Sequence, residues 1–396
     1  MQIAYPGIIL KKGRSTSLLR GHPWLFSGAI ARIEGKPAAG DIALTRDFSG
    51  KPLALGFYNP QTDIAFRLLT RNCQEEINAD FWRKRVQSAV ALRSRIINRQ
   101  TDAYRLINAE GDGFPGLIVD VYGRTLVISI ATAGMEKQKK YILDVLLALT
   151  QAGRIYEQSE GRSRKLEGLE NFRGLIFGNE QSGPATIREN GLQFEVDIPG
   201  GQKTGFFLDQ RQNRETLGKI SSGSRVLNCF CYTGAFSVYC AAGGAQQVCS
   251  VDISKTACAA ARRHLAINNF SSADNPVLEA DVFDYLRQTG ECFDLIILDP
   301  PAFAKAKQDI GKAARGYKEI NLQAVKRLAP GGFLATFSCS NFIGEEFFAR
   351  IVLEAARDAG TDMQLLQKLQ AGHDHPAAFG HQEGTYLKGL LLTKSY

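Results

Sequence analysis

Two side chains that could act on a substrate, a thiol and a carboxylate, each follow a predicted strand in the second half of the sequence. Asp299 ends the apolar run Leu295–Asp299, and two prolines follow it, so the strand cannot continue. Cys339 follows the run Phe333–Ser338 and stands between two serines. A free thiol has a pKa of about 8.5, and it becomes a strong nucleophile once it loses its proton. The two positions therefore predict a site in which a cysteine attacks and a carboxylate assists.

Carboxylates at the ends of three successive predicted strands indicate a pocket for a nucleoside. Asp252 ends the second strand of the α/β pattern, about 20 residues after the loop Asn228–Gly234, which is the usual place for a carboxylate that binds ribose hydroxyls. Asp281 ends a later strand, where a carboxylate can reach an adenine amino group. The loop Asn228–Gly234 contains one glycine, whereas a dinucleotide pyrophosphate needs close backbone approach over several. The pattern argues against NAD or FAD and favours S-adenosylmethionine. The expected cofactor residues are Asn228, Phe230, Tyr232, Thr233, Gly234, Asp252, Asp281 and Asp299.

A thiol beside a methyl donor predicts methylation of a pyrimidine carbon. Carbon 5 of cytosine is a poor nucleophile, but thiolate attack at carbon 6 makes an enamine-like adduct whose carbon 5 can accept a methyl group. A carboxylate near ring N3 and the amino group would stabilise the charge that builds there. We therefore expect Cys339 as nucleophile, Asp299 as the carboxylate, and Phe303 stacked on a flat group. The sequence does not identify the base that removes the carbon 5 proton.

The elements that would position these groups alternate between strand and helix, which predicts a doubly wound α/β domain. A hairpin with a type I′ turn is expected first, at Ile187–Asp197, because Asn190-Gly191 separates two alternating arms. Open sheets of this class bind ligands at the carboxyl ends of their strands. The expected strands are Val226–Phe230, Val248–Asp252, Val277–Asp281, Leu295–Asp299 and Phe333–Ser338, with helices near 235–242, 254–268, 282–288, 317–328 and 345–359.

The positive charge of the chain is concentrated in residues 1–110. These residues contain 17 Lys+Arg and 9 Asp+Glu, which accounts for the whole formal net charge of +8. A local basic excess is typical of a module that binds a polyanion, although a solvated basic face stays possible. Lys11, Lys12 and Arg14 precede Trp24, and cations interleaved with aromatic rings suit RNA. Trp24 and Phe26 could equally be core residues, and the core is the favoured place for Phe26.

Three domains are predicted. Short β-like runs broken by Gly, Pro and Asn indicate an all-β module over residues 1–75. Residues 76–182 read as an α+β middle domain, whose first helix is expected at Phe81–Asn98 with Asp80 as its N-cap. The α/β domain is placed at residues 183–396.

The remaining features predict a cytoplasmic protein without a metal. No apolar stretch is long enough to span a bilayer, and the N-terminus lacks the order of a signal peptide. The eight cysteines contain no Cys-x-x-Cys pair and are expected to be free thiols. His373, His375 and His381 lack a matched ligand pair at zinc spacing, so we expect no metal site there.

The motifs taken together resemble a known family over the full length of the chain. They are Gly21–Phe26, Arg105–Gly116, Gln202–Arg211 with Asn213 and Arg214, Asn228–Gly234, Asp299–Phe303 and Ser338–Ser340. The set is similar to the bacterial 23S ribosomal RNA large subunit methyltransferase I family, which comprises S-adenosylmethionine-dependent cytosine-C5 enzymes with an N-terminal PUA domain. The resemblance implies a Rossmann-like class I methyltransferase domain that acts on 23S ribosomal RNA.

The resemblance also implies roles for residues. Cys339 would be the nucleophile, and Lys203, Gln210 and Arg211 would line the site. Cys231 departs from the family pattern, in which a serine is more frequent. No second cysteine follows Asp299, so product release would proceed without a second thiol.

Two other functions stay open. A guanine-N7 or other base-nitrogen RNA methyltransferase would share Phe-Leu-Asp-Gln-Arg and Asp-Pro-Pro-x-Phe, but a ring nitrogen is already nucleophilic and needs no thiol. Cys339 therefore discriminates between the two reactions. The third candidate is a non-catalytic RNA-binding factor of ribosome assembly. The sequence does not say which cytosine is modified, whether the substrate is naked RNA or an assembling subunit, or whether the protein is a homodimer.

Overall fold

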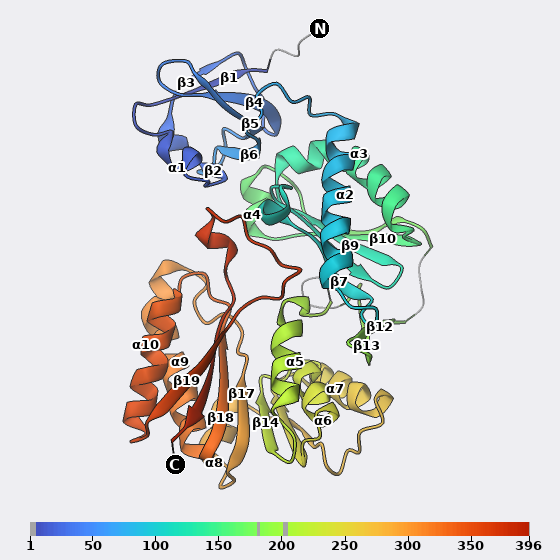
Figure 1. The fold of residues 1–396 in the computed structure, drawn as a ribbon, viewed down its shortest axis with the longest axis vertical. Helices are drawn as coiled ribbons and strands as arrows, with labels where there is room; N and C mark the ends of the chain where they lie inside the picture. The colour runs from blue at the N-terminus through green and yellow to red at the C-terminus, as the bar shows by residue number, and fades with distance from the viewer. Residues whose placement is uncertain (1–4, 180–182, 201–204, 396) are drawn as a thin grey trace. The chain divides into compact units, whose positions relative to one another are not determined.

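The computed structural model describes residues 5–179, 183–200 and 205–395 (Figure 1). The chain divides into two compact units, and neither is continuous in sequence. Unit 1 comprises Met1–Asn190, Val196–Leu208 and His373–Gly384, and unit 2 comprises Gly191–Glu195, Asp209–Gly372 and Thr385–Tyr396. The predicted boundary at residue 75 falls inside unit 1, so the three-domain division stays a prediction.

The N-terminal part of unit 1 is a six-stranded sheet with a single-turn helix, as the short β-like runs predicted. Its strand order is β2-β6-β5-β4-β1-β3. The elements are β1 (Gly7–Leu10), α1 (Thr16–Leu19), β2 (Trp24–Leu25), β3 (Ile30–Glu34), β4 (Asp41–Arg46), β5 (Pro52–Tyr58) and β6 (Phe66–Thr70). Ile8, Leu10 and Leu25 pack in its core. Phe26 was wrongly expected in the core: it is 49% exposed, because neighbouring side chains along an extended chain point to opposite faces and Leu25 takes the inward one.

The rest of unit 1 is built on a five-stranded sheet of order β11-β10-β9-β8-β7. Its elements are α2 (Ala79–Ile96), β7 (Ala103–Asn108), β8 (Leu117–Tyr122), β9 (Thr125–Ile130), α3 (Ala133–Thr150), β10 (Arg154–Ser159), α4 (Arg162–Leu166) and β11 (Phe172–Phe177). The N-cap of α2 is Asn78 and not the predicted Asp80. The Asn78 side chain accepts hydrogen bonds from the backbone N–H groups of Asp80 and Phe81, so Asp80 already lies inside the first turn.

A two-stranded sheet follows, formed by β12 (Ala185–Glu189) and β13 (Leu192–Val196). Asn190 and Gly191 have φ angles of 50° and 86°. A type I′ turn requires a positive φ at both central residues, so the predicted hairpin is confirmed.

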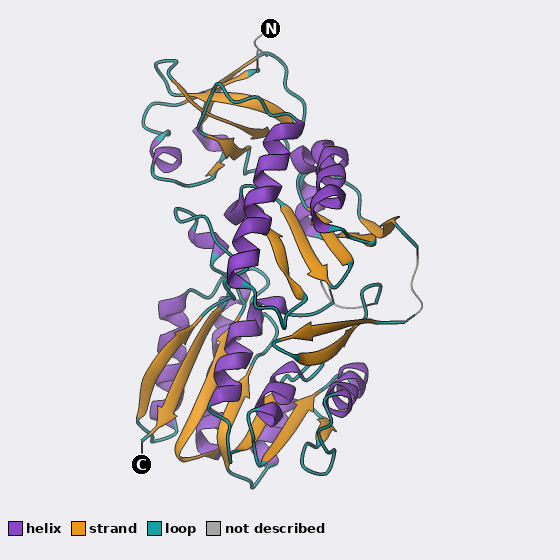
Figure 2. Cartoon of the chain, turned by 45° about the vertical axis from the view of Figure 1, so that its right-hand side comes forward, coloured by secondary structure: helices purple, strands orange, loops and turns teal. Residues whose placement is uncertain are grey.

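Unit 2 contains a seven-stranded sheet of order β16-β15-β14-β17-β18-β20-β19. Figure 2 shows the strands of this unit in orange with helices in purple beside them. The first five strands of this order are parallel, and β20 is antiparallel to both of its neighbours. The predicted α/β class is confirmed. The elements are α5 (Arg211–Lys219), β14 (Arg225–Cys229), α6 (Ala235–Ala242), β15 (Gln247–Asp252), α7 (Lys255–Ile267), β16 (Val277–Glu279), α8 (Val282–Gln288), β17 (Phe293–Leu298), α9 (Ile310–Arg327), β18 (Leu328–Ser338), α10 (Glu345–Asp358), β19 (Met363–Leu369) and β20 (Lys388–Lys394).

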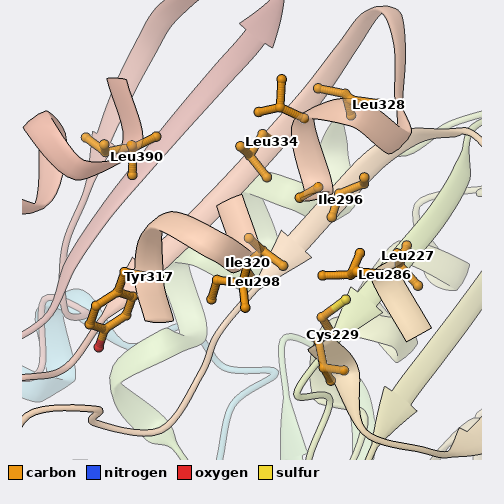
Figure 3. Packing of buried hydrophobic residues seen from close by; sticks show 14 of the residues in the cluster. Leu227, Cys229, Leu286, Ile296, Leu298, Tyr317, Ile320, Leu328, Leu334 and Leu390 are labelled. Atoms are coloured by element: carbon orange, nitrogen blue, oxygen red, sulfur yellow. The ribbon is translucent and has the colours of Figure 1, made fainter. Parts of the chain in front are cut away.

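Two apolar layers cover this sheet. On one face, Leu227, Ile296 and Leu334 pack against side chains of α8, α9 and α10 (Figure 3). On the other face, Val226 and Ile297 pack against side chains of α5 and α6. The central strands are buried on both faces, which is why they read as continuous apolar runs in the sequence. No helix in the described ranges combines the length and the apolarity that crossing a membrane requires.

Candidate active site

The carboxyl ends of the parallel strands place the predicted catalytic groups along one edge of the unit 2 sheet. The strand order reverses between β14 and β17, and ligands bind at such a switch point in open α/β sheets. Asp252 ends β15, Asp299 follows β17, and Cys339 follows β18, the neighbour of β17. The Cys339 Sγ lies 4.0 Å from the carbonyl oxygen of Pro300, the residue after Asp299. The structure thus brings the thiol to the Asp-Pro-Pro loop, as the sequence predicted.

Cys339 differs from most of the other thiols in its exposure. All eight cysteines are free, and Cys339 is half-buried. Five cysteines of unit 2 are buried: Cys229, Cys231, Cys240, Cys249 and Cys258. Burial raises the pKa of each of these five thiols, that of Cys240 to about 12. A buried thiol with a raised pKa is inert, so Cys339 is the best-placed nucleophile at this edge.

The loop between β14 and α6 has an unusual backbone that Asp252 holds in place. Phe230 and Tyr232 have φ angles of 57° and 48°, which non-glycine residues rarely adopt. The two Asp252 carboxylate oxygens accept hydrogen bonds of 2.8 Å from the N–H groups of Tyr232 and Ser254. Each oxygen keeps a second acceptor position, so Asp252 can hold the loop and still bind a hydroxyl group. Backbone strain of about 1–3 kcal/mol at each such residue is typical of ligand-binding loops.

The loop packs closely on α7, and three aromatic rings lie near it at the same edge of the sheet. Gly234 has a φ of 76°, and a Cβ atom there would lie 2.7 Å from the Cβ atom of Ala261. The loop therefore approaches α7 closely, with little room for larger residues. Phe230, Phe283 and Phe303 form a half-buried group of rings with centroids 6.1–6.4 Å apart. These rings offer an apolar wall at the same edge of the sheet, where an adenosine could pack.

Two predicted cofactor residues, Asn228 and Asp281, make hydrogen bonds to other parts of the fold. Asn228 is buried, and its Nδ2 donates a hydrogen bond of 2.8 Å to Ser237 Oγ, so its amide ties β14 to α6 beneath the loop. Asp281 is exposed and caps α8 by accepting a hydrogen bond of 3.1 Å from the N–H of Asp284. A cofactor contact by either side chain stays a prediction.

Gln210 and Arg211, which were expected to line the site, are both buried. The Gln210 side chain accepts a hydrogen bond of 2.6 Å from Asn213, and Asn213 also donates to the carbonyl oxygen of Gln370. These bonds anchor the first turn of α5 to the chain after β19. Lys203 lies outside the described residues.

The sequence reasoning missed His264, a buried residue of α7 that supports the cofactor loop. Its ring nitrogens lie 2.7 Å from the carbonyl oxygen of Thr233 and 3.0 Å from the backbone of Glu195. Burial lowers the pKa of His264, so the ring is neutral. A neutral ring donates to Thr233 from one nitrogen and accepts the N–H of Glu195 at the other. A lone histidine in a helix gives no signal of this role in the sequence.

The predicted RNA-binding residues of unit 1 fall into two groups. Lys11, Lys12 and Arg14 are exposed, and the Lys12 ammonium lies 5.8 Å from the ring of Phe48, which is itself 58% exposed. Trp24, in contrast, is half-buried and already engaged. Its Nε1 donates a hydrogen bond of 2.8 Å to Glu110, and its ring packs against that of His381 at 4.3 Å.

No cluster of three metal-ligating side chains occurs in the described part of the chain.

Comparison with family models matches residues 172–392 to S-adenosylmethionine-dependent methyltransferases and residues 8–71 to a PUA-like domain. The first match covers more than half of the chain, so S-adenosylmethionine is its cofactor.

Curated relatives match almost the whole chain. Ribosomal RNA large subunit methyltransferase I of Aeromonas salmonicida is 44% identical over 97% of this chain and 98% of its own length. The protein of the same name from Photobacterium profundum is 44% identical with the same coverage.

Among solved structures, a chain from Streptococcus mutans, provisionally assigned as a SAM-dependent methyltransferase, aligns with a TM-score of 0.83. It is 24% identical, and the alignment covers 98% of this chain and 99% of that one. Another methyltransferase of provisional assignment, complexed with SAH, gives a TM-score of 0.84 at 24% identity with the same coverage. These two likenesses show the fold. Sequence identity and family models together show that the chain belongs to the ribosomal RNA large subunit methyltransferase I family of S-adenosylmethionine-dependent methyltransferases.

Proposed function

We propose that the protein methylates carbon 5 of a cytosine in 23S ribosomal RNA through a covalent adduct between Cys339 and carbon 6. The observation that carries the proposal is the position of the half-buried Cys339 thiol, whose Sγ is 4.0 Å from Pro300 O in the loop that follows Asp299. A methyltransferase that acts on a ring nitrogen needs no thiol at this place, because the nitrogen lone pair is already nucleophilic.

The proposed reaction uses the thiol as a temporary electron donor to the ring. The Cys339 thiolate forms an S–C6 bond, and the displaced π electrons make carbon 5 nucleophilic. Asp299, as the carboxylic acid, would donate a hydrogen bond to N3, where negative charge develops as the S–C6 bond forms. Bound S-adenosylmethionine supplies an electrophilic methyl group on a sulfonium. After carbon 5 has been methylated, water takes up its proton, the C–H electron pair restores the C5–C6 double bond, and the S–C6 bond breaks, which regenerates the Cys339 thiolate.

The cofactor residues keep the roles that the sequence predicted, as part of this proposal. The loop containing Phe230, Tyr232, Thr233 and Gly234 would surround the methyl donor, with Asp252 on the ribose and Asp281 on the adenine. Phe303 would contribute to the apolar wall and not to an open stacking surface, because Tyr317 packs against it with ring centroids 4.6 Å apart.

The basic surface of unit 1 would hold the RNA backbone. Lys11, Lys12 and Arg14 are exposed and suit phosphate, whereas the exposed ring of Phe48 suits an unpaired base. Trp24 was predicted to bind substrate, but its contacts favour a supporting role. A cytosine in a helical stack would have to be flipped out to reach the thiol. Action on ribosomal RNA would place the protein in the cytoplasm.

The test is transfer of labelled methyl from S-adenosylmethionine to unmodified 23S RNA, with nucleoside mass spectrometry, for the wild type and Cys339→Ala. The proposal requires 5-methylcytidine from the wild type and none from the variant. Cys292→Ala is the matched control, because that cysteine is exposed at the other end of the sheet, just before β17. Methylguanosine, or an active Cys339→Ala variant, would support base-nitrogen methylation. No transfer, with no methyl-donor binding by calorimetry, would support the RNA-binding assembly factor.

A further inference from the structure

Lys388 places a buried ammonium group beside the residues that carry the thiol. It is the first residue of β20 and pairs with Ser338, the last residue of β18. Its side chain is 8% exposed, and its Nζ donates a hydrogen bond of 2.7 Å to the carbonyl oxygen of Ser340. The charge thus lies against the residue that follows Cys339.

No carboxylate oxygen of the described residues lies within ion-pair distance of this ammonium group. The Lys388 Nζ donates instead to a neutral carbonyl oxygen. Lysine is almost never buried without an anion, because removing an ammonium from water is costly. Burial lowers the pKa of Lys388, and the groups that oppose this effect are the Cys339 thiol first and then Glu345. A buried cation that lacks an anion, next to a group that can become one, indicates that the two act together.

A second set of contacts holds the thiol-bearing loop rigid. Tyr317 of α9 is fully buried, and its hydroxyl oxygen accepts a hydrogen bond of 3.0 Å from Ser338 Oγ. It lies 3.3 Å from Ser340 Oγ, which also accepts a hydrogen bond of 3.2 Å from the N–H of Ala304. The two serines that flank the thiol are therefore fixed to α9 and to the loop after β17. Burial raises the pKa of Tyr317, so its hydroxyl stays protonated and adds no charge.

We propose that Lys388 is a positioning residue that stabilises the thiolate of Cys339 and holds its loop through Ser340. The inference rests on the proposed role of Cys339. The thiol releases its proton to solvent before it attacks, and Lys388 stays protonated throughout. The charged groups to be weighed against Lys388 are Glu345 from α10, whose carboxylate pairs with Lys368 at 2.7 Å, and Asp299 after β17. Each opposes a thiolate while it is ionised.

The test measures alkylation of Cys339 by iodoacetamide against pH in the full-length protein, with peptide mass spectrometry to read each cysteine separately. In the wild type, Cys339 should reach half-maximal rate at a lower pH than the exposed Cys292, which serves as an internal reference. Lys388→Met should raise that midpoint by about one pH unit, which is about a tenfold lower rate at neutral pH. Lys388→Arg, which keeps the charge, should restore most of the rate.

Lys394→Met is the matched control. Lys394 lies at the other end of the same strand, about 20 Å away at about 3.4 Å per residue, and it also donates to carbonyl oxygens, those of Val325 and Leu328. It should leave the Cys339 midpoint unchanged. An equal shift in both variants, or none in Lys388→Met, would overturn the proposal.

In the wild type, a pH of half-maximal alkylation for Cys339 at or above that for Cys292 would also overturn the proposal. This comparison needs no variant, so the proposal can be refuted even if Lys388→Met does not fold. The alkylation result is independent of the RNA reaction. A wild type that shows the predicted midpoints but makes no 5-methylcytidine would refute the proposed function alone.

Discussion

Tyr317→Phe should loosen the residues around the thiol, and the structure sets the size of the effect. The change removes the hydroxyl that accepts from Ser338 Oγ at 3.0 Å and leaves that serine buried without its acceptor. A buried polar group that loses its partner costs about 1–3 kcal/mol. Ser340 loses less, because its Oγ still accepts from the N–H of Ala304. We therefore expect about 1–2 kcal/mol of local destabilisation, together with a fall in the rate of methyl transfer.

A double-mutant cycle with Ser338→Ala isolates this interaction. Ser338→Ala also removes the acceptor of the Ser340 N–H at 3.4 Å, and it does so in the single and the double variant alike. The double variant should therefore lose less stability than the sum of the two single variants. Hydrogen exchange read by mass spectrometry on peptides of α9 and β18 gives the local free energy of opening. This method suits the chain because both tryptophans, Trp24 and Trp82, lie in unit 1 and would not report on these elements.

Tyr285→Phe is the matched control for Tyr317→Phe, because its half-buried hydroxyl has a weak contact of 3.5 Å to Cys249 Sγ and a second one to the Thr289 side chain. Tyr285→Phe should change the hydrogen exchange of α8, its own helix, by less than Tyr317→Phe changes the hydrogen exchange of α9. Additive effects of Tyr317→Phe and Ser338→Ala, with no coupling between them, would refute the reasoning.

Other predictions concern the loop that contains Gly234, the buried His264, and the exposed basic residues of unit 1. Gly234→Ala should weaken S-adenosylmethionine binding in calorimetry more than Gly223→Ala, since both have a positive φ but an added Cβ meets open space only at Gly223. Because the pKa of His264 is lowered in the fold, the unfolded chain binds more protons, so the free energy of unfolding should fall as the pH drops below about 6.5. Urea unfolding at several pH values should show this slope, and His264→Gln should reduce it. Lys12→Gln and Arg14→Gln should each lower the slope of log affinity for RNA against log salt by about 0.7–0.9 if they contact phosphate. An unchanged slope in filter binding would contradict that assignment.

The central strands and the groups at their ends could be predicted from the sequence, because each strand is a continuous apolar run followed directly by a reactive side chain. A parallel strand covered on both faces must be apolar throughout, so a carboxylate or thiol that follows it marks the ligand-binding edge. Asp299 and Cys339 were predicted in this way. The direction of a polar side chain within a buried element leaves no such signal, so the sequence did not show that Asn228 and Gln210 are buried and hydrogen-bonded to Ser237 and Asn213. A cofactor contact by either side chain stays a prediction.

The sequence did not predict β19 or β20, and Lys388 was missed with them. The pairing of Ser338 with Lys388 joins residues 50 positions apart across an antiparallel edge of a parallel sheet. The apolar run before Lys394 is short and could be helix or strand on periodicity alone. A pairing of this kind depends on where the chain returns to the sheet, which local residue patterns do not encode.

The order of the strands divides the candidate site into two parts with different tasks. Most of the groups expected to hold the methyl donor lie on or after β14, β15 and β16, whereas Asp299, the thiol and Lys388 lie on or after β17, β18 and β20, across the switch point. A nitrogen acceptor needs only the first part and a means of orienting the base. A carbon acceptor also needs a nucleophile, a charge that stabilises it and a rigid support. The thiol after β18, the ammonium group of β20 and the support from Tyr317 of α9 and two serines would meet these needs, and the proposed carbon methylation rests on that arrangement.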